Sequence, residues 1–184
     1  VAMIQRVSVY SHPGKPEAVR LSKKIRRLVG RHAEIVPIER SQVLFVLGGD
    51  GTILSVAPEA ARHGVPIIGV NVGRLGFLAE FTSKNLFSNM KNILSENFKI
   101  EERRMLDVWV TKSRRPMKLG VALNEMLLVR AGLARIPELS ITIGGEPAGL
   151  FSLDGVIVST PTGSTGHALA AGGPVLSPKT RAFL

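Results

Sequence analysis

A single aspartate stands among three glycines at residues 48–52, directly after the apolar run at 43–47. Glycines let backbone amides approach phosphate oxygens closely, and the N-terminus of a following helix adds partial positive charge. Beside phosphates, a carboxylate either accepts a proton from an attacking hydroxyl or helps to hold Mg²⁺. The structural alternative is a tight turn in which the aspartate caps a helix. The pattern favours a phosphate-binding loop made of Gly48, Gly49, Asp50, Gly51 and Thr52.

A second segment with glycines, residues 71–80, follows the apolar run at 65–70. Its glycines permit a close turn of the backbone. Phe77 and Leu78 in this segment have two interpretations, which the sequence alone leaves open. They line a pocket for an adenine or nicotinamide ring, or they pack into the core against the next helix.

Two adjacent polar residues, Asn124 and Glu125, interrupt the apolar stretch at 121–130. In a single strand, successive side chains point to opposite faces, so one of the two has to face inward. A buried carboxylate needs hydrogen-bond donors, and ribose hydroxyls supply them. The alternative is an ion pair at the end of the strand between Glu125 and Arg130.

Small hydroxyl side chains are concentrated within the glycine-rich segment at 154–174, which begins as a short strand. Hydroxyl groups both donate and accept hydrogen bonds, which suits an uncharged, hydroxyl-rich ligand. The hydroxyl residues are Ser159, Thr160, Thr162, Ser164 and Thr165.

Apolar periodicity predicts an α/β unit that positions the first two segments and a mostly β unit that positions the others. We expect strands at 4–10, 43–47 and 65–70, a helix at 16–29 that Gly30 ends, a helix at 52–63 that Pro58 interrupts, and a helix that Ser83 caps and that continues to Leu94. Turn-separated segments at 106–110, 121–130 and 139–143 are predicted antiparallel strands, with Leu139, Ile141 and Ile143 facing inward. We place the domain boundary near 98–103, which gives domains 1–100 and 101–184.

Composition limits the class of protein and its ligands. The chain has 184 residues, 45% hydrophobic and 21% charged, with no cysteine, and its four histidines lack the spacing of a helical zinc site, so we expect any metal ion to be bound through oxygen. The net charge of +10 suits phosphate ligands, nucleic acid or a solvated surface. Aromatic residues make up only 5%, which leaves few surfaces for stacking bases, so we expect no nucleic-acid partner.

The chain carries no signal for a membrane or for secretion. Its apolar runs are far shorter than the roughly 20 residues of a membrane span, and the N-terminus has no secretory pattern. We therefore expect a cytoplasmic protein without a membrane partner.

The loop at 48–52 resembles the nucleotide-phosphate loop shared by NAD kinases, diacylglycerol and sphingosine kinases, and phosphofructokinases. The segments at 71–80 and 154–174 and the Asn124-Glu125 pair resemble NAD kinases specifically. The resemblance covers about 43–178. It implies a Rossmann-like, phosphofructokinase-like α/β N-terminal domain with a parallel sheet, followed by a mostly antiparallel β-sandwich C-terminal domain that is incomplete in this chain, because family members are longer.

The resemblance also implies the reaction. A phosphoryl group passes from ATP or inorganic polyphosphate to the 2′-hydroxyl of the adenosine ribose of NAD, and NADP forms. Asp50 is then the general base, Gly48, Gly49, Gly51 and Thr52 bind phosphate, and Mg²⁺ is held mainly by the phosphates of the ligand. The implied NAD-binding residues are Asp50, Gly51, Phe77, Asn124, Glu125, Arg135, Asp154, Thr162, Thr165, Gly166, His167, Ala168, Leu169 and Ala170.

Two further implications and two alternatives complete the expectations. The family implies a homodimer or homotetramer. Family members commonly have Ala-Tyr where this chain has Gly166-His167, so an imidazole replaces an aromatic ring near the expected ligand. One alternative is a lipid or sphingoid-base kinase with the same first loop. The other is a non-catalytic nucleotide-binding module that touches nucleic acid through the predicted helix at 16–29, which is rich in lysine and arginine.

Overall fold

The computed structural model describes residues 3–74, 76–132 and 135–184. It divides into two units, Val1–Glu101 and Glu102–Leu184. The sequence places the boundary between residues 100 and 101. Each unit is described by itself below.

Parallel strands form the centre of the first unit. The sheet has five strands in the order β2-β1-β3-β4-β5, and every neighbouring pair is parallel. The central strand β3 is buried along its whole length, because its apolar side chains face helices on both sides of the sheet. The pairing of β1 with β3 begins at Val7 and Val43. The strands are β1 Arg6–Ser11, β2 Glu34–Ile35, β3 Val43–Gly48, β4 Ile67–Asn71 and β5 Phe81–Thr82.

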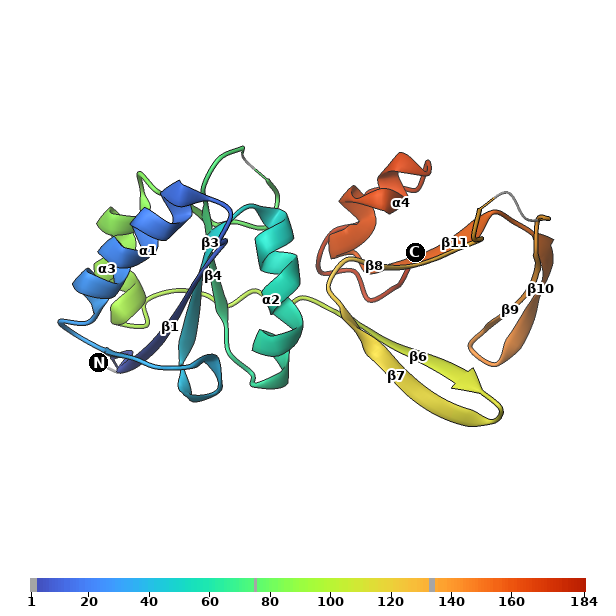
Figure 1. Cartoon of the computed structure of the whole chain (residues 1–184), viewed down its shortest axis with the longest axis horizontal. Helices are drawn as coiled ribbons and strands as arrows, with labels where there is room; N and C mark the ends of the chain where they lie inside the picture. The colour runs from blue at the N-terminus through green and yellow to red at the C-terminus, as the bar shows by residue number, and fades with distance from the viewer. Residues whose placement is uncertain (1–2, 75, 133–134) are drawn as a thin grey trace. The chain divides into compact units, whose positions relative to one another are not determined.

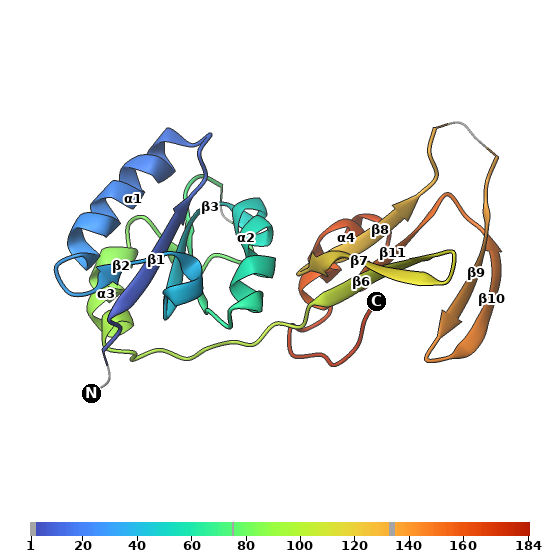
Figure 2. The same cartoon turned by 60° about the horizontal axis from the view of Figure 1, so that its bottom comes forward.

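Helices cover both faces of this sheet (Figure 1 and Figure 2). The helices α1 (Pro16–Val29) and α3 (Leu86–Leu94) pack against the face that carries Phe45. The helix α2 (Asp50–Arg62) packs against the opposite face, which carries Leu44 and Val46. A short 3-10 helix, Ile38–Arg40, precedes β3. The predicted α/β unit with a parallel sheet is confirmed.

Two helix starts differ from the prediction. The helix expected from residue 52 begins at Asp50, and Pro58 lies within it without ending it. The third helix begins at Leu86 with Asn85 as its N-cap, so the prediction that Ser83 caps it was wrong. The Asn85 side chain binds the preceding turn instead, since its Oδ1 accepts from Thr82 N at 2.7 Å. The expected end of the first helix at Gly30 is confirmed.

The second unit consists of antiparallel strand pairs, as predicted. The pairs are β6 with β7, β8 with β11 and β9 with β10, and the β6–β7 hairpin closes where Lys112 pairs with Arg115. After β11 the chain forms a 3-10 helix, Thr162–Thr165, and the short helix α4, His167–Ala170. The strands are β6 Leu106–Lys112, β7 Arg115–Ala122, β8 Glu125–Val129, β9 Glu138–Ile143, β10 Glu146–Ser152 and β11 Gly155–Ser159.

The predicted strand at 121–130 was wrong as a single strand. The chain bends at Leu123 and Asn124, so β7 ends before the bend and β8 begins after it. The bend is held by the segment that follows the neighbouring strand β11, since Thr160 N donates to Asn124 O at 2.8 Å. In β9, Ile143 was expected to face inward and is 71% exposed instead. Among the described residues, no helix is long and apolar enough to cross a membrane.

Candidate functional site

The glycine loop at 48–52 forms the junction between β3 and α2. Gly49 is the N-cap of α2, and its carbonyl oxygen accepts from Thr52 N at 2.9 Å and Ile53 N at 3.3 Å. A Cβ at Gly48 would overlap the Thr52 side chain, so this tight junction requires a glycine. The positive end of the helix dipole and the free amides of the first turn make such a junction suitable for binding an anion.

The Asp50 carboxylate bonds to the segment that follows β4 and not to its own helix. Oδ2 accepts from Phe77 N at 2.8 Å, and Oδ1 accepts from Leu78 N at 3.2 Å. A Cβ at Gly76 would overlap this carboxylate. Among the described residues, no side chain caps α2, so the interpretation of Asp50 as a helix cap was wrong. The carboxylate is instead fixed at the carboxyl edge of the sheet by two backbone amides.

The two apolar side chains after Gly76 have different environments. Leu78 packs against the core cluster that contains Leu44 and Val46. Phe77 is 78% exposed. Core packing therefore accounts for Leu78 and not for Phe77, whose ring is available to a ligand.

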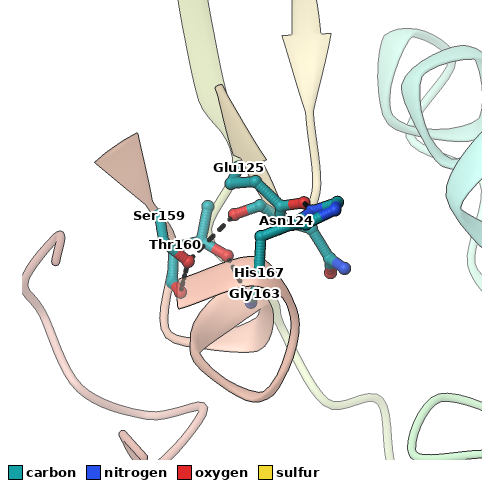
Figure 3. A network of polar contacts seen from close by, with 6 residues as sticks. All are labelled: Asn124, Glu125, Ser159, Thr160, Gly163 and His167. Carbon is teal, nitrogen blue, oxygen red and sulfur yellow. Dashed lines mark hydrogen bonds and ion pairs between the residues drawn. The ribbon is translucent and has the colours of Figure 1, made fainter. Parts of the chain in front are cut away.

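A carboxylate and an imidazole form the centre of the candidate site in the second unit (Figure 3). His167 Nδ1 lies 2.6 Å from Glu125 Oε1, and the Glu125 side chain is only 12% exposed. Because an ionised carboxylate only accepts hydrogen bonds, Nδ1 has to carry the proton. Arg130 bonds to Asp154 at 2.5 Å, so the predicted alternative of an ion pair between Glu125 and Arg130 was wrong.

Two acceptor atoms beside this pair are buried and have no partner within the described part of the chain. They are Glu125 Oε2 and Asn124 Oδ1. The position of a Cβ on Gly166 would lie 3.2 Å from Glu125 Oε2 and 3.5 Å from Asn124 Nδ2, so the glycine leaves space at the carboxylate. A buried acceptor without a donor is costly, and a ligand hydroxyl would supply the donor.

The hydroxyl side chains after β11 mostly hold the chain's own turn. Thr160 Oγ1 donates to Leu123 O at 2.6 Å and accepts from Gly163 N at 3.1 Å. Ser164 Oγ donates to Pro161 O at 2.7 Å. The buried hydroxyls of Thr160 and Ser164 are thus satisfied internally, which the expectation of a hydroxyl-rich ligand surface did not anticipate.

The remaining predicted residues are spread more widely. Thr162 is buried, with its Oγ1 3.5 Å from Arg103 Nη1, and Thr165 Oγ1 donates to Thr162 O at 3.4 Å. In α4, Ala168 is buried, whereas Leu169 and Ala170 are exposed.

The structure brings Asn124, Glu125, Gly166 and His167 together, but it does not bring Asp154 to them. Asp154 immediately precedes Gly155, at the end of the β8–β11 pair opposite to that of Glu125. With about 3.4 Å per residue, that separation is roughly 17 Å. Arg135 is exposed, in the segment before β9.

Family comparisons agree with the two units. The model of the ATP-NAD kinase N-terminal domain matches residues 11–98, and that of the ATP-NAD kinase C-terminal domain matches residues 123–184. The chain belongs to the NAD kinase family. An NAD kinase of Heliobacterium modesticaldum is 37% identical over 181 residues, which cover 98% of this chain and 58% of that protein. The chain therefore spans little more than half the length of this relative.

Solved structures of the NAD kinase family have the same fold. The crystal structure of an Archaeoglobus fulgidus NAD kinase in complex with ATP is 26% identical, with a TM-score of 0.75, and the match covers 97% of this chain and 70% of that chain. Yeast NADH kinase complexed with NADH is 24% identical, with a TM-score of 0.83, and the match covers 99% of this chain and 65% of that chain. The predicted combination of an α/β unit with an antiparallel β unit is thereby confirmed.

Two polar residues, Asn71 and Lys15, were not identified from the sequence as candidates for the site. Asn71 ends β4, and its Oδ1 is buried without a partner in the described residues, while its Nδ2 donates to Arg74 O at 2.8 Å. Lys15 follows β1, and its Nζ donates to Val72 O at 3.1 Å. Both lie at the carboxyl ends of parallel strands, where ligands of α/β sheets bind. For Asn71, the available signal was a polar residue directly after the apolar run at 65–70.

No cluster of protein ligands for a metal ion is present in the described ranges. Groups of three or more His, Asp or Glu side chains that could hold an ion do not occur in residues 3–74, 76–132 and 135–184.

Proposed function

We propose that the protein that contains this chain is an NAD kinase, which transfers a phosphoryl group to the 2′-hydroxyl of the adenosine ribose of NAD and releases NADP. The donor is ATP or inorganic polyphosphate. The observation that carries the proposal is the position of Asp50 at the start of α2, where two backbone amides hold its carboxylate beside the glycine loop. Membership of the NAD kinase family supplies the substrate class.

Asp50 is the proton acceptor in this proposal. The hydrogen bonds from Phe77 N and Leu78 N each use one lone pair of a carboxylate oxygen, so further lone pairs remain for a substrate hydroxyl. As the ribose oxygen attacks the terminal phosphorus, a new O–P bond forms, the O–P bond to the leaving phosphate breaks, and the hydroxyl proton moves to Asp50. The amides of the loop 48–52 hold the phosphates in line for this transfer.

The carboxylate of Asp50 also suits Mg²⁺, which uses one or two carboxylates together with waters and substrate phosphates. When bound, the ion neutralises charge on the donor phosphates. This arrangement agrees with an ion that is held mainly by the ligand.

The second unit is proposed to hold NAD. Glu125 Oε2 and Asn124 Oδ1 accept hydrogen bonds from ribose hydroxyls, which satisfies two buried acceptors. We assign the surrounding contacts to the Thr162–Thr165 turn, to Gly166 and to α4. Phe77, Arg135 and Asp154 remain proposed NAD ligands. The proposal includes a cytoplasmic homodimer or homotetramer.

The decisive assay incubates the complete protein with NAD, Mg²⁺ and either ATP or polyphosphate. NADP is detected with an NADP-specific dehydrogenase, and a parallel reaction contains excess EDTA. We expect NADP to form with at least one donor and EDTA to stop its formation. If a folded protein forms no NADP with either donor, the proposal fails, and lipid acceptors become the next substrates to test.

A further inference from the structure

A hollow opens at the carboxyl edge of the parallel sheet, between the loops that follow β1 and β3. The strand order β2-β1-β3 reverses direction at this point, because the chain runs from β1 to β2 on one side and returns to β3 on the other. The loop after β1 leads to α1 on one face, and the loop after β3 leads to α2 on the opposite face (Figure 1). Ligands of open α/β sheets bind where the strand order reverses in this way.

The hollow has the size of a ligand site and a lining that includes charged and polar side chains. Its volume is about 510 Å³, within the range of small-molecule pockets. Its wall comes from the end of β1 and the loop after it, with Tyr10, His12, Pro13 and Lys15, and from the start of α2, with Gly49, Gly51, Thr52 and Ser55.

Lys15 supplies a fixed positive charge to this wall. Its Nζ donates to Val72 O at 3.1 Å, and it lies 3.6 Å from the position that a Cβ of Gly49 would occupy and 3.7 Å from that of Gly73. An ammonium group has three N–H donors, so two remain after the bond to Val72. The ammonium therefore lies beside the backbone of the glycine loop with donors available to a ligand.

His12 adds a neutral donor. Its Nδ1 accepts from Gly14 N at 3.1 Å, so a neutral ring carries its proton on Nε2. The carboxylate next to the hollow belongs to Asp50, and both of its oxygens are bonded to Phe77 N and Leu78 N. The lining thus combines one cation, one imidazole donor and the N-terminus of α2, which favours an anion with several oxygens.

We propose that Lys15 is the principal cationic ligand of the donor phosphates, which the glycine loop at 48–52 binds in the proposed function. The inference rests on the proposed function and adds to it residues of the loop after β1, none of which belongs to the motifs that indicate the family. Phosphate oxygens accept from Lys15 Nζ and His12 Nε2 while the amides of the glycine loop bind the same chain of phosphates. Lys15 is a binding residue for the donor and makes no contribution to acceptor binding.

The test compares three variants of the complete protein in steady-state kinetics and in calorimetric binding of inorganic tripolyphosphate. Lys15→Met removes the charge, Lys15→Arg keeps it, and Lys23→Met removes an exposed lysine from α1 as a matched control. We expect Lys15→Met to raise the KM for the donor by about 10- to 100-fold, which is the worth of a charged hydrogen bond, and to leave the KM for NAD unchanged. Lys15→Arg is expected to recover much of the loss, and Lys23→Met to behave as wild type.

The binding measurement separates failure of this inference from failure of the proposed function. If the wild-type protein makes no NADP, the proposed function fails, and tripolyphosphate binding still decides about the hollow. Binding that is lost in Lys15→Met and kept in Lys23→Met supports the subsite. Equal donor KM values, or equal tripolyphosphate affinities in the two methionine variants, would overturn it.

Discussion

Replacement of Asp50 by asparagine separates the two roles of this side chain. The carboxylate is the proposed proton acceptor, and it also holds the segment after β4 through Phe77 N and Leu78 N. Asparagine keeps one acceptor oxygen but directs an NH₂ group at the second backbone amide. Asp50→Asn therefore removes the base and one of the two hydrogen bonds.

The two losses differ in size. Removal of a general base lowers kcat by about 10² to 10⁴, which corresponds to roughly 3–5.5 kcal/mol of activation free energy. Loss of one hydrogen bond to a charged group costs about 1–3 kcal/mol of the free energy of unfolding, and the exposed position of the Phe77 bond favours the lower end. In a domain of about 100 residues, such as the first unit, a loss of 1 kcal/mol in the free energy of unfolding lowers Tm by about 4–8 °C. We expect a large fall in kcat, a modest fall in Tm and an almost unchanged KM for NAD.

Gly76→Ala is the matched control. An added Cβ would overlap the Asp50 carboxylate, so this variant disturbs the contact with the loop and keeps the carboxylate. NADP formation and thermal melting are measured for both variants. An unchanged kcat in Asp50→Asn would remove Asp50 from the mechanism. If both variants lose the same kcat at the same Tm, Asp50 only holds the loop and is not the base.

Three further predictions concern the second unit. Glu125→Gln is expected to raise the KM for NAD by about tenfold or more and to leave the KM for the donor unchanged, because a charged acceptor is lost; an unaltered KM for NAD would contradict the role of this residue. Gly163→Ala is expected to destabilise the protein by about 1–3 kcal/mol in thermal melting, since a Cβ there would overlap the Asn124 backbone; an unchanged Tm would show that the turn adapts. The hydrogen bond from Lys118 is the main cause that lowers the pKa of Asp107, so Lys118→Met should raise that pKa in an NMR titration. A lowered carboxyl pKa stabilises the folded state only above that pKa, so this contribution should vanish as the pH falls through it.

Local sequence patterns predicted the buried strand β3 and its junction with α2. The apolar run before Gly48 predicted a strand buried on both faces, and the structure confirms β3 there. The glycine loop predicted the junction with α2, although the helix begins two residues earlier than expected, at Asp50 rather than Thr52. The single strand at 121–130 failed because the bend at Asn124 is stabilised by Thr160, which is remote in sequence.

Local sequence patterns could not predict the contacts that define the candidate site. The bonds of Asp50 to Phe77 and Leu78, and the pairing of Glu125 with His167, join residues that only the tertiary fold brings together. The resemblance to NAD kinases named Asp50, Phe77, Glu125 and His167 as ligands, but periodicity does not give their partners. Their roles in binding NAD stay predictions that the variants above test.

The two units differ in how far apart along the chain their paired strands lie, and this difference affects the order of folding. The β6–β7 hairpin closes where Lys112 meets Arg115, so it needs only a short loop and forms in about 1–10 μs in typical hairpins. The pairing of Val7 with Val43 in the first unit requires closure of a long segment that includes α1. Since such non-local parallel pairing slows folding, we expect the sheet that carries the glycine loop to form after the β6–β7 hairpin, and its unpaired strand edges to be prone to aggregation until it is complete.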